Sequence, residues 1–177
     1  MEDPYTWVGR GIIKQRVEEA LKTTDVACRK LEAIKDGETT NFIYKGTLLA
    51  PLEDCFVYIK HGRGYSACDP ALRMPMFRCD LEAECLTTLE NFPLETIPSV
   101  RTPRLEYFDP EKSIQVQEFM ADPTDLKTYA HKHFTFDPDR MPWCEELGRK
   151  LGAWLRRFHA WAMEPPQQEF REKVLGF

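Results

Sequence analysis

The sequence contains no long run of Lys or Arg, and its formal net charge is −5 over 177 residues. Binding to nucleic acid or to an acidic membrane surface depends on clustered positive charge. The charge pattern therefore predicts neither partner. The chain also has no signal-like apolar start and no apolar run of the roughly 18 residues that a transmembrane helix needs. We therefore expect no membrane span.

The sequence also lacks the short motifs that mark metal sites and several hydrolase families. None of its six cysteines forms a C-x-x-C pair, and no H-E-x-x-H or G-x-S-x-G pattern occurs. His131 and His133 have a spacing compatible with one metal ion, but no third ligand is placed by spacing, and we interpret them as polar surface. The scattered cysteines are interpreted as reduced thiols, which predicts a cytoplasmic protein.

What is present is a series of strand-like segments interrupted by amphipathic ones. With 42% hydrophobic and 30% charged residues, the chain is long enough to bury a core without a metal or disulfide. A period of two residues predicts a strand, and a period of 3.6 predicts a helix. On this basis we expect strands at residues 29–34, 42–49, 55–60, 105–107 and 114–119, and helices at about 4–22, 75–89, 126–131 and 143–162.

This order of segments predicts an α+β fold, in which a five-stranded antiparallel sheet with one helix precedes a set of helices. Hairpin turns are predicted at Asp36-Gly37 and at Asp109–Lys112. The composition changes after Met120, where Asp122-Pro123-Thr124-Asp125 has the character of a linker. We therefore expect a helical segment at residues 1–27, the sheet domain at 28–120 and a helical part at 121–177.

Lys60 and Glu82 are the first candidate functional residues. Residues 56–60 have the pattern of an apolar strand that ends in Lys60, so its ammonium group would lie at the rim of a rigid element. Glu82 follows on a predicted helix, at the margin of the apolar face, where a carboxylate benefits from a nearby cation. Glu84 is the second choice for this role. The alternative is that the lysine and the carboxylate are both solvated surface groups.

The turn between the first two strands and the end of the last strand supply further candidates. Gly37 and Asn41 belong to a turn whose backbone N–H groups could contact phosphate oxygens. A plain hairpin turn is the alternative, because the same turn carries two acidic residues. Gln117, Glu118, Phe119 and Met120 would present main-chain donors and acceptors in a flat apolar slot. Phe119 and Met120 are equally compatible with a place in the core.

In their order, these segments resemble the aminoglycoside phosphotransferase and choline kinase-like proteins, which have a protein kinase-like fold. The resemblance covers residues 28–162 and rests on Gly37 with Asn41, residues 56–60, Arg78 with residues 82–86, Ile97-Pro98, residues 117–120, residues 125–129, and Leu147-Gly148 through Phe158-His159. It implies a kinase-like N-lobe followed by a partial helical C-lobe. It also implies that Lys60 aligns the phosphates of ATP, that Glu82 fixes Lys60, and that the backbone of residues 117–120 holds adenine.

The sequence departs from that family at the catalytic loop. The expected His-Gly-Asp start, the later Asn and the metal-binding Asp do not follow the last long helix, and His61-Gly62 is followed by Arg63. Phosphoryl transfer needs an oriented nucleophile and the charge of a metal ion. We therefore expect a chain truncated before the catalytic loop, with ATP as its ligand, without the residues that would hold Mg²⁺, and without phosphoryl transfer on its own.

The predicted partners follow from the last long helix. Trp154, Phe158 and Trp161 would be covered by later elements of a complete C-lobe, and here we expect them to form an uncovered aromatic patch. Such a patch predicts a homo-oligomer or pairing with a complementary kinase C-lobe. The alternative function is a non-enzymatic scaffold or interaction module that uses the same helix. The residues single out no small-molecule substrate.

Overall fold

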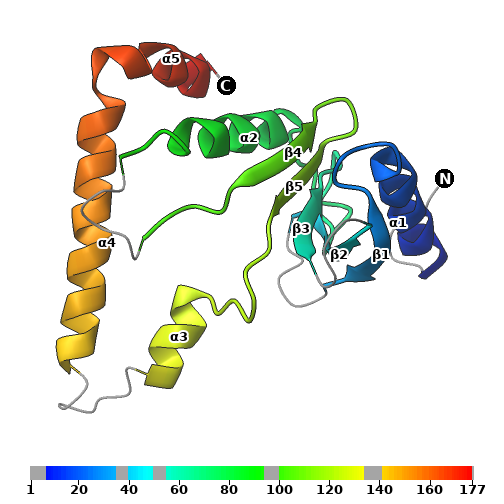
Figure 1. Ribbon diagram of the computed structural model, residues 1–177, viewed down its shortest axis with the longest axis horizontal. Coiled ribbons are helices and arrows are strands. Elements are labelled where there is room, and N and C mark those ends of the chain that lie inside the picture. The colour runs from blue at the N-terminus through cyan, green and yellow to red at the C-terminus, as the bar shows by residue number, and fades with distance from the viewer. Residues whose placement is uncertain (1–6, 35–39, 50–54, 94–99, 134–140, 177) are drawn as a thin grey trace. The chain divides into compact units, whose positions relative to one another are not determined.

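Five antiparallel strands form a single sheet, and the protein has the mixed α+β fold that the sequence predicts. The computed structural model describes residues 7–34, 40–49, 55–93, 100–133 and 141–176. The strand order is β1-β2-β3-β5-β4, so β3 is the central strand. The elements, shown in Figure 1, are α1 (Trp7–Leu21), β1 (Cys28–Ala33), β2 (Phe42–Leu48), β3 (Phe56–His61), α2 (Phe77–Leu89), β4 (Leu105–Asp109), β5 (Ile114–Glu118), α3 (Leu126–His133), α4 (Met141–Ala162), the 3₁₀ turn η2 (Pro165–Gln167) and α5 (Gln168–Gly176).

Each predicted strand and helix corresponds to an element of the structure, and the differences lie at the ends. The predicted turn at Asp109–Lys112 is present, because the Lys112 amide donates to Asp109 Oδ1 at 2.9 Å. The predicted helix start at Asp3-Pro4 and the predicted turn at Asp36-Gly37 lie outside the described residues. The sequence did not predict α5, which follows the two prolines that end α4.

The chain divides into two compact units, which alternate along the sequence. One unit is drawn from residues 1–87 and 103–119, and it contains the sheet, α1 and nearly all of α2. The other is drawn from residues 88–102 and 120–176, and it contains α3, α4 and α5.

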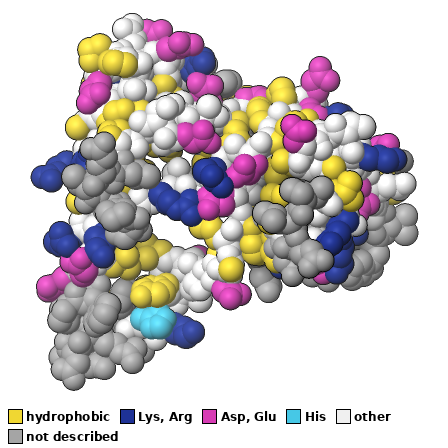
Figure 2. Space-filling model, in the orientation of Figure 1, with side chains coloured by type: hydrophobic (Ala, Val, Ile, Leu, Met, Phe, Trp, Pro, Cys, Tyr) yellow, Lys and Arg dark blue, Asp and Glu magenta, His cyan; other side chains and the backbone are white. Residues whose placement is uncertain are grey.

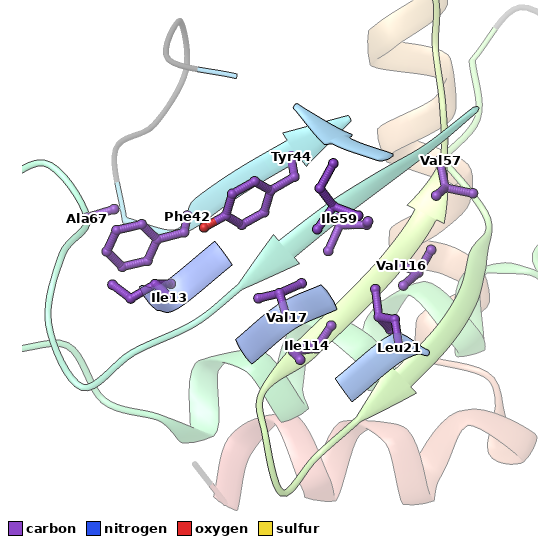
Figure 3. Packing of buried hydrophobic residues seen from close by; sticks show 11 residues of the cluster. Ile13, Val17, Leu21, Phe42, Tyr44, Val57, Ile59, Ala67, Ile114 and Val116 are labelled. Carbon is purple, nitrogen blue, oxygen red and sulfur yellow. The ribbon is translucent and has the colours of Figure 1, made fainter. Parts of the chain in front are cut away.

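The core of the first unit lies between α1 and one face of the sheet. Successive side chains of a strand point to opposite faces, and the strand register places Tyr44, Ile59 and Val116 side by side. α1 covers this face with a stripe of buried residues spaced by four, as a helix packed on a sheet requires. Figure 3 shows the cluster, whose labelled members are Ile13, Val17, Leu21, Phe42, Tyr44, Val57, Ile59, Ala67, Ile114 and Val116.

The second unit is organised around aromatic residues on one side of α4. Trp154 and Phe158 stack with ring centroids 5.5 Å apart, and Phe92 packs edge-on against Trp161 at 5.2 Å. Trp161 is buried, so the expected uncovered patch is wrong for this residue, because Phe92 covers it. Arg171 of α5 donates to the carbonyl oxygens of Ala162 and Glu164, which closes the end of α4.

The surface carries charges of both signs, which are interspersed on the face shown in Figure 2. Among the helices that the structure describes, none is both long and apolar enough to cross a bilayer. The six cysteines are free thiols. Within the described ranges, no group of three or more His, Cys, Asp or Glu side chains is placed to hold a metal ion.

Gly46 of β2 is packed too tightly to accept a side chain, which makes it a test of the core. A Cβ atom there would lie 2.6 Å from Cys28 Sγ, 2.8 Å from Ile59 Cδ1 and 2.9 Å from Val57 Cγ2. We expect Gly46→Ala to lower the free energy of unfolding by about 1–3 kcal/mol, measured by urea denaturation. The control is Gly11→Ala in α1, where no atom lies within 4 Å of the new Cβ. That variant should be about 0.5–1 kcal/mol more stable than wild type, and equal effects of the two changes would contradict the packing described.

His61, buried at the end of β3 on the α1 side of the sheet, predicts a pH dependence of stability. Burial lowers its pKa to about 4, the guanidinium groups of Arg63 and Arg16 act in the same direction, and the backbone of Ser113 and Lys112 opposes them. Because an unfolded histidine has a pKa of about 6.5, the unfolded chain takes up a proton first, and stability falls as the pH drops through this window. Between pH 7 and pH 5, wild type should lose about 2 kcal/mol more than His61→Leu in urea denaturation. Parallel losses in the two proteins would show that His61 does not have the lowered pKa.

Candidate functional site

Lys60 and Glu82 meet on the sheet face opposite α1. The register places Lys60 beside Ile43 of β2 and Gln115 of β5, on the face that α2 covers. Lys60 Nζ forms an ion pair and a hydrogen bond with Glu82 Oε1 of α2. The two side chains are 19% and 36% exposed, so the pair lies at the rim of the interface between sheet and helix. The predicted pairing with Glu82, and not with Glu84, is present.

Two buried glutamines hold α2 against this face. Gln115 Nε2 donates to the Cys79 carbonyl oxygen at 2.7 Å, and Gln117 Nε2 donates to Gln115 Oε1 at 3.0 Å. Buried polar groups are almost always hydrogen-bonded, and these bonds use both ends of the Gln115 amide and the Nε2 group of Gln117. Since Cys79 lies one turn before Glu82, the bonds also fix the height of Glu82 above Lys60.

Arg78 ties the start of α2 to the start of β2. Its guanidinium group donates to Asn41 Oδ1 at 2.7 Å, to the Thr40 carbonyl oxygen at 3.2 Å and to Thr40 Oγ1 at 3.4 Å. Asn41 is buried, and its side-chain oxygen is used in this contact. The structure thus gives Asn41 a role in positioning α2, and its contact with phosphate stays a prediction. Gly37 lies outside the described residues.

Three side chains form an aromatic and cationic cluster farther along the same face. The rings of Phe56 and Phe119 lie 5.6 Å apart, and Lys45 Nζ lies 3.7 Å from the first ring centroid and 4.9 Å from the second. Each of these cation–π contacts is within the distance at which the ring face attracts a cation. The sequence singled out Phe119 but not Lys45 or Phe56. The alternation of side chains along β3 could have identified Phe56, because it puts Phe56, Tyr58 and Lys60 on one face.

The predicted slot residues at the end of β5 do not all face the same surroundings. Gln117 is buried against Gln115, and the backbone N–H of Glu118 donates to the Arg104 carbonyl oxygen at 2.9 Å. Met120 is 49% exposed and belongs to the second unit. The N–H of Glu118 is therefore used in strand pairing, and Phe119 is the predicted slot residue whose ring lies in the cluster with Lys45.

Burial sets the protonation of the groups around the ion pair. The pKa of Tyr58 is raised, first by burial and then by the negative charge of Glu82. Burial likewise raises the pKa values of Cys79 and Cys85 on α2. All three groups are therefore protonated at neutral pH. Neither thiol is a nucleophile under these conditions.

Comparison with known proteins shows a weak similarity to a phosphotransferase. No protein-family model matches the chain. The chain is 27% identical over 157 residues to the phosphotransferase FrzJ of Cladobotryum sp. The matched region is 81% of this chain and 40% of FrzJ, so the chain spans less than half the length of that protein. The chain therefore has a distant similarity to a phosphotransferase.

The Arg78 contacts predict a clear loss of stability when the guanidinium fork is removed. Arg78→Met would leave the buried oxygen of Asn41 without its donor, which costs about 1–3 kcal/mol of unfolding free energy. Arg78→Lys keeps the charge but not the forked guanidinium group. Its free energy of unfolding should lie between those of Arg78→Met and wild type. Arg104→Met is the matched control, because Arg104 is 67% exposed and its ion pair with Glu106 is on the surface. Urea denaturation of the four proteins checks this order, and similar losses for Arg78→Met and Arg104→Met would contradict it.

Proposed function

We propose that this chain is a phosphotransferase-like protein that binds ATP, with Lys60 as the contact to the phosphates. The observation that carries the proposal is the ion pair between Lys60 on the central strand and Glu82 on α2. The similarity to a named phosphotransferase supports the same class of function. The chain spans 40% of that relative. The activity and the substrate of a whole phosphotransferase would therefore be a separate proposal.

The geometry suits a phosphate contact for two physical reasons. A lysine ammonium has three donors, and the bond to Glu82 uses one of them, which leaves donors for phosphate oxygens. The carboxylate also restrains a flexible side chain, so less conformational entropy is lost when a phosphate binds. On the same face, Phe56 and Phe119 supply apolar surface of the kind that lines the slot for a base.

Titration with ATP and with adenosine tests the proposal. If Lys60 contacts phosphate, Lys60→Ala removes a hydrogen bond between charged groups, and ATP should bind about 10–100-fold more weakly. Adenosine has no phosphate, so its affinity should stay within about twofold of wild type. Isothermal titration calorimetry measures both ligands on both proteins. Lys30→Ala is the control, because Lys30 is a surface residue 62% exposed and paired with Glu32.

Glu82→Gln tests whether the carboxylate acts by holding Lys60. The variant keeps the size of the side chain and removes the charge, so ATP should bind several-fold more weakly while adenosine is unaffected. Glu84→Gln, two residues along the same helix, should leave ATP affinity unchanged. Equal ATP affinity in wild type, Lys60→Ala and Glu82→Gln would refute the phosphate contact. If titration of the wild-type protein with ATP produces neither heat nor a change in fluorescence, the scaffold alternative is favoured.

A further inference from the structure

A cavity of about 890 Å³ lies on the α1 side of the sheet, within the first unit. Its walls come from the second half of α1, from residues 61–65 with Arg73 and Met76, and from the turn between β4 and β5. The volume is within the range of small-molecule sites in proteins. Lys60 lies on the other face of β3, so this cavity is separate from the candidate nucleotide site.

The segment after β3 that walls the cavity is held by its own hydrogen bonds. Ser66 N donates to the Leu72 carbonyl oxygen at 2.9 Å, and Met74 N donates to the Gly64 carbonyl oxygen at 3.1 Å. An Arg10 guanidinium nitrogen of α1 donates to the Ala67 carbonyl oxygen at 3.0 Å, which anchors the segment to the helix. The cavity is therefore formed before any ligand arrives, which lowers the entropic cost of binding.

His61 gives the cavity an unsatisfied polar group. The residue is 6% exposed and lines the cavity, and the backbone of Ser113 and Lys112 lies beside its ring, but neither ring nitrogen makes a hydrogen bond of normal geometry with a described residue. Leaving a buried donor unpaired costs free energy, and in native proteins such a group calls for a bound water, an ion or a functional role. The ring nitrogens are closed off from solvent, so a ligand oxygen in the cavity would supply the missing partner once the ring turns toward it.

The charge of the lining favours an anion. Its cationic residues are Arg16, Arg63, Arg73 and Lys112, and its acidic residues are Glu19 and Glu111. The lining thus has an excess of positive charge in a protein whose net charge is −5. Lys112 pairs with Asp109 and Glu19 pairs with Lys22, and Arg16 and Arg63 also interact with other residues.

Much of the rest of the lining is apolar. Val17 and Ala20 of α1, Ile114 of β5 and the ring of Tyr65 contribute to the walls. Val17 and Ile114 belong to the core cluster, so the floor of the cavity is closely packed. A ligand that fits both parts has an apolar body and a charged group with oxygen acceptors.

We infer that this cavity binds a small organic anion, with its apolar body against α1 and β5 and its phosphate or carboxylate oxygens near His61, Arg63 and Arg73. The site is additional to the proposed ATP contact and does not depend on it. Phosphate monoesters and carboxylates both have the oxygen acceptors that the lining needs.

Ring-nitrogen NMR of protein labelled with ¹⁵N-histidine tests the inference, with phenyl phosphate as the probe. The chain has four histidines, and His61→Gln assigns the signal of interest. Millimolar phenyl phosphate should shift the His61 signal saturably and leave those of the other three histidines in place. Benzyl alcohol, which has the ring but no charge, should shift it much less. Repeating the titration with benzoate then shows whether the site prefers a carboxylate or a phosphate.

Matched arginine variants decide whether the lining charge is responsible. Arg73→Gln and Arg63→Gln should each raise the dissociation constant of phenyl phosphate by about fivefold or more. Arg104→Gln makes the same chemical change at an exposed arginine outside the cavity, and should leave the constant unchanged. Lys60→Ala should also keep the His61 shift, since Lys60 lies on the other face. An unshifted His61 signal with both anions, an equal response to benzyl alcohol, or equal constants in the Arg73 and Arg104 variants would overturn the inference.

Discussion

The central strand β3 is covered on both faces, and this constraint organises the first unit. Because side chains alternate along a strand, neighbouring residues of β3 serve different layers. Ile59 belongs to the apolar cluster under α1, Lys60 pairs with Glu82 of α2, and His61 returns to the α1 side, where it lines the cavity. A shift of one residue in the pairing of β3 would exchange these layers and bury the ammonium group under α1. The strand register therefore fixes the core and both candidate sites together.

Much of this arrangement could be predicted because it depends on local signals. The alternation of residues 56–60 gave the strand and the face of Lys60, and the apolar stripe of the next helix gave the margin where Glu82 lies. The fold class followed from the order of such segments, and the structure confirms it. The role of Lys60 in binding ATP and the partners depend on a ligand or a second molecule, and they stay predictions, as do the domain boundaries.

The remaining features could not be predicted because they join residues that are far apart in the sequence. Gln115 bonds to a residue 36 positions away, and a glutamine in a strand gives no sign that it will be buried. The lining of the cavity likewise comes from three separate stretches of chain. The missed helix α5 has a different cause. Pro165 and Pro166 are a signal for the end of helical structure, but proline is also compatible with a first helical turn, and here a 3₁₀ turn leads into α5.

The ion pair is a poor source of stability, and this bears on why it is there. At a partly exposed rim, the attraction between two charges is largely offset by their desolvation and by the ordering of a long side chain. The apolar cluster under α1, with Val17, Ile59 and Val116 almost fully buried, supplies far more. A lysine held by Glu82, on a helix that Gln115 and Arg78 lock in place, is what the proposed phosphate contact would need, since that contact requires a fixed positive charge. The weak similarity to a phosphotransferase points to the same chemistry.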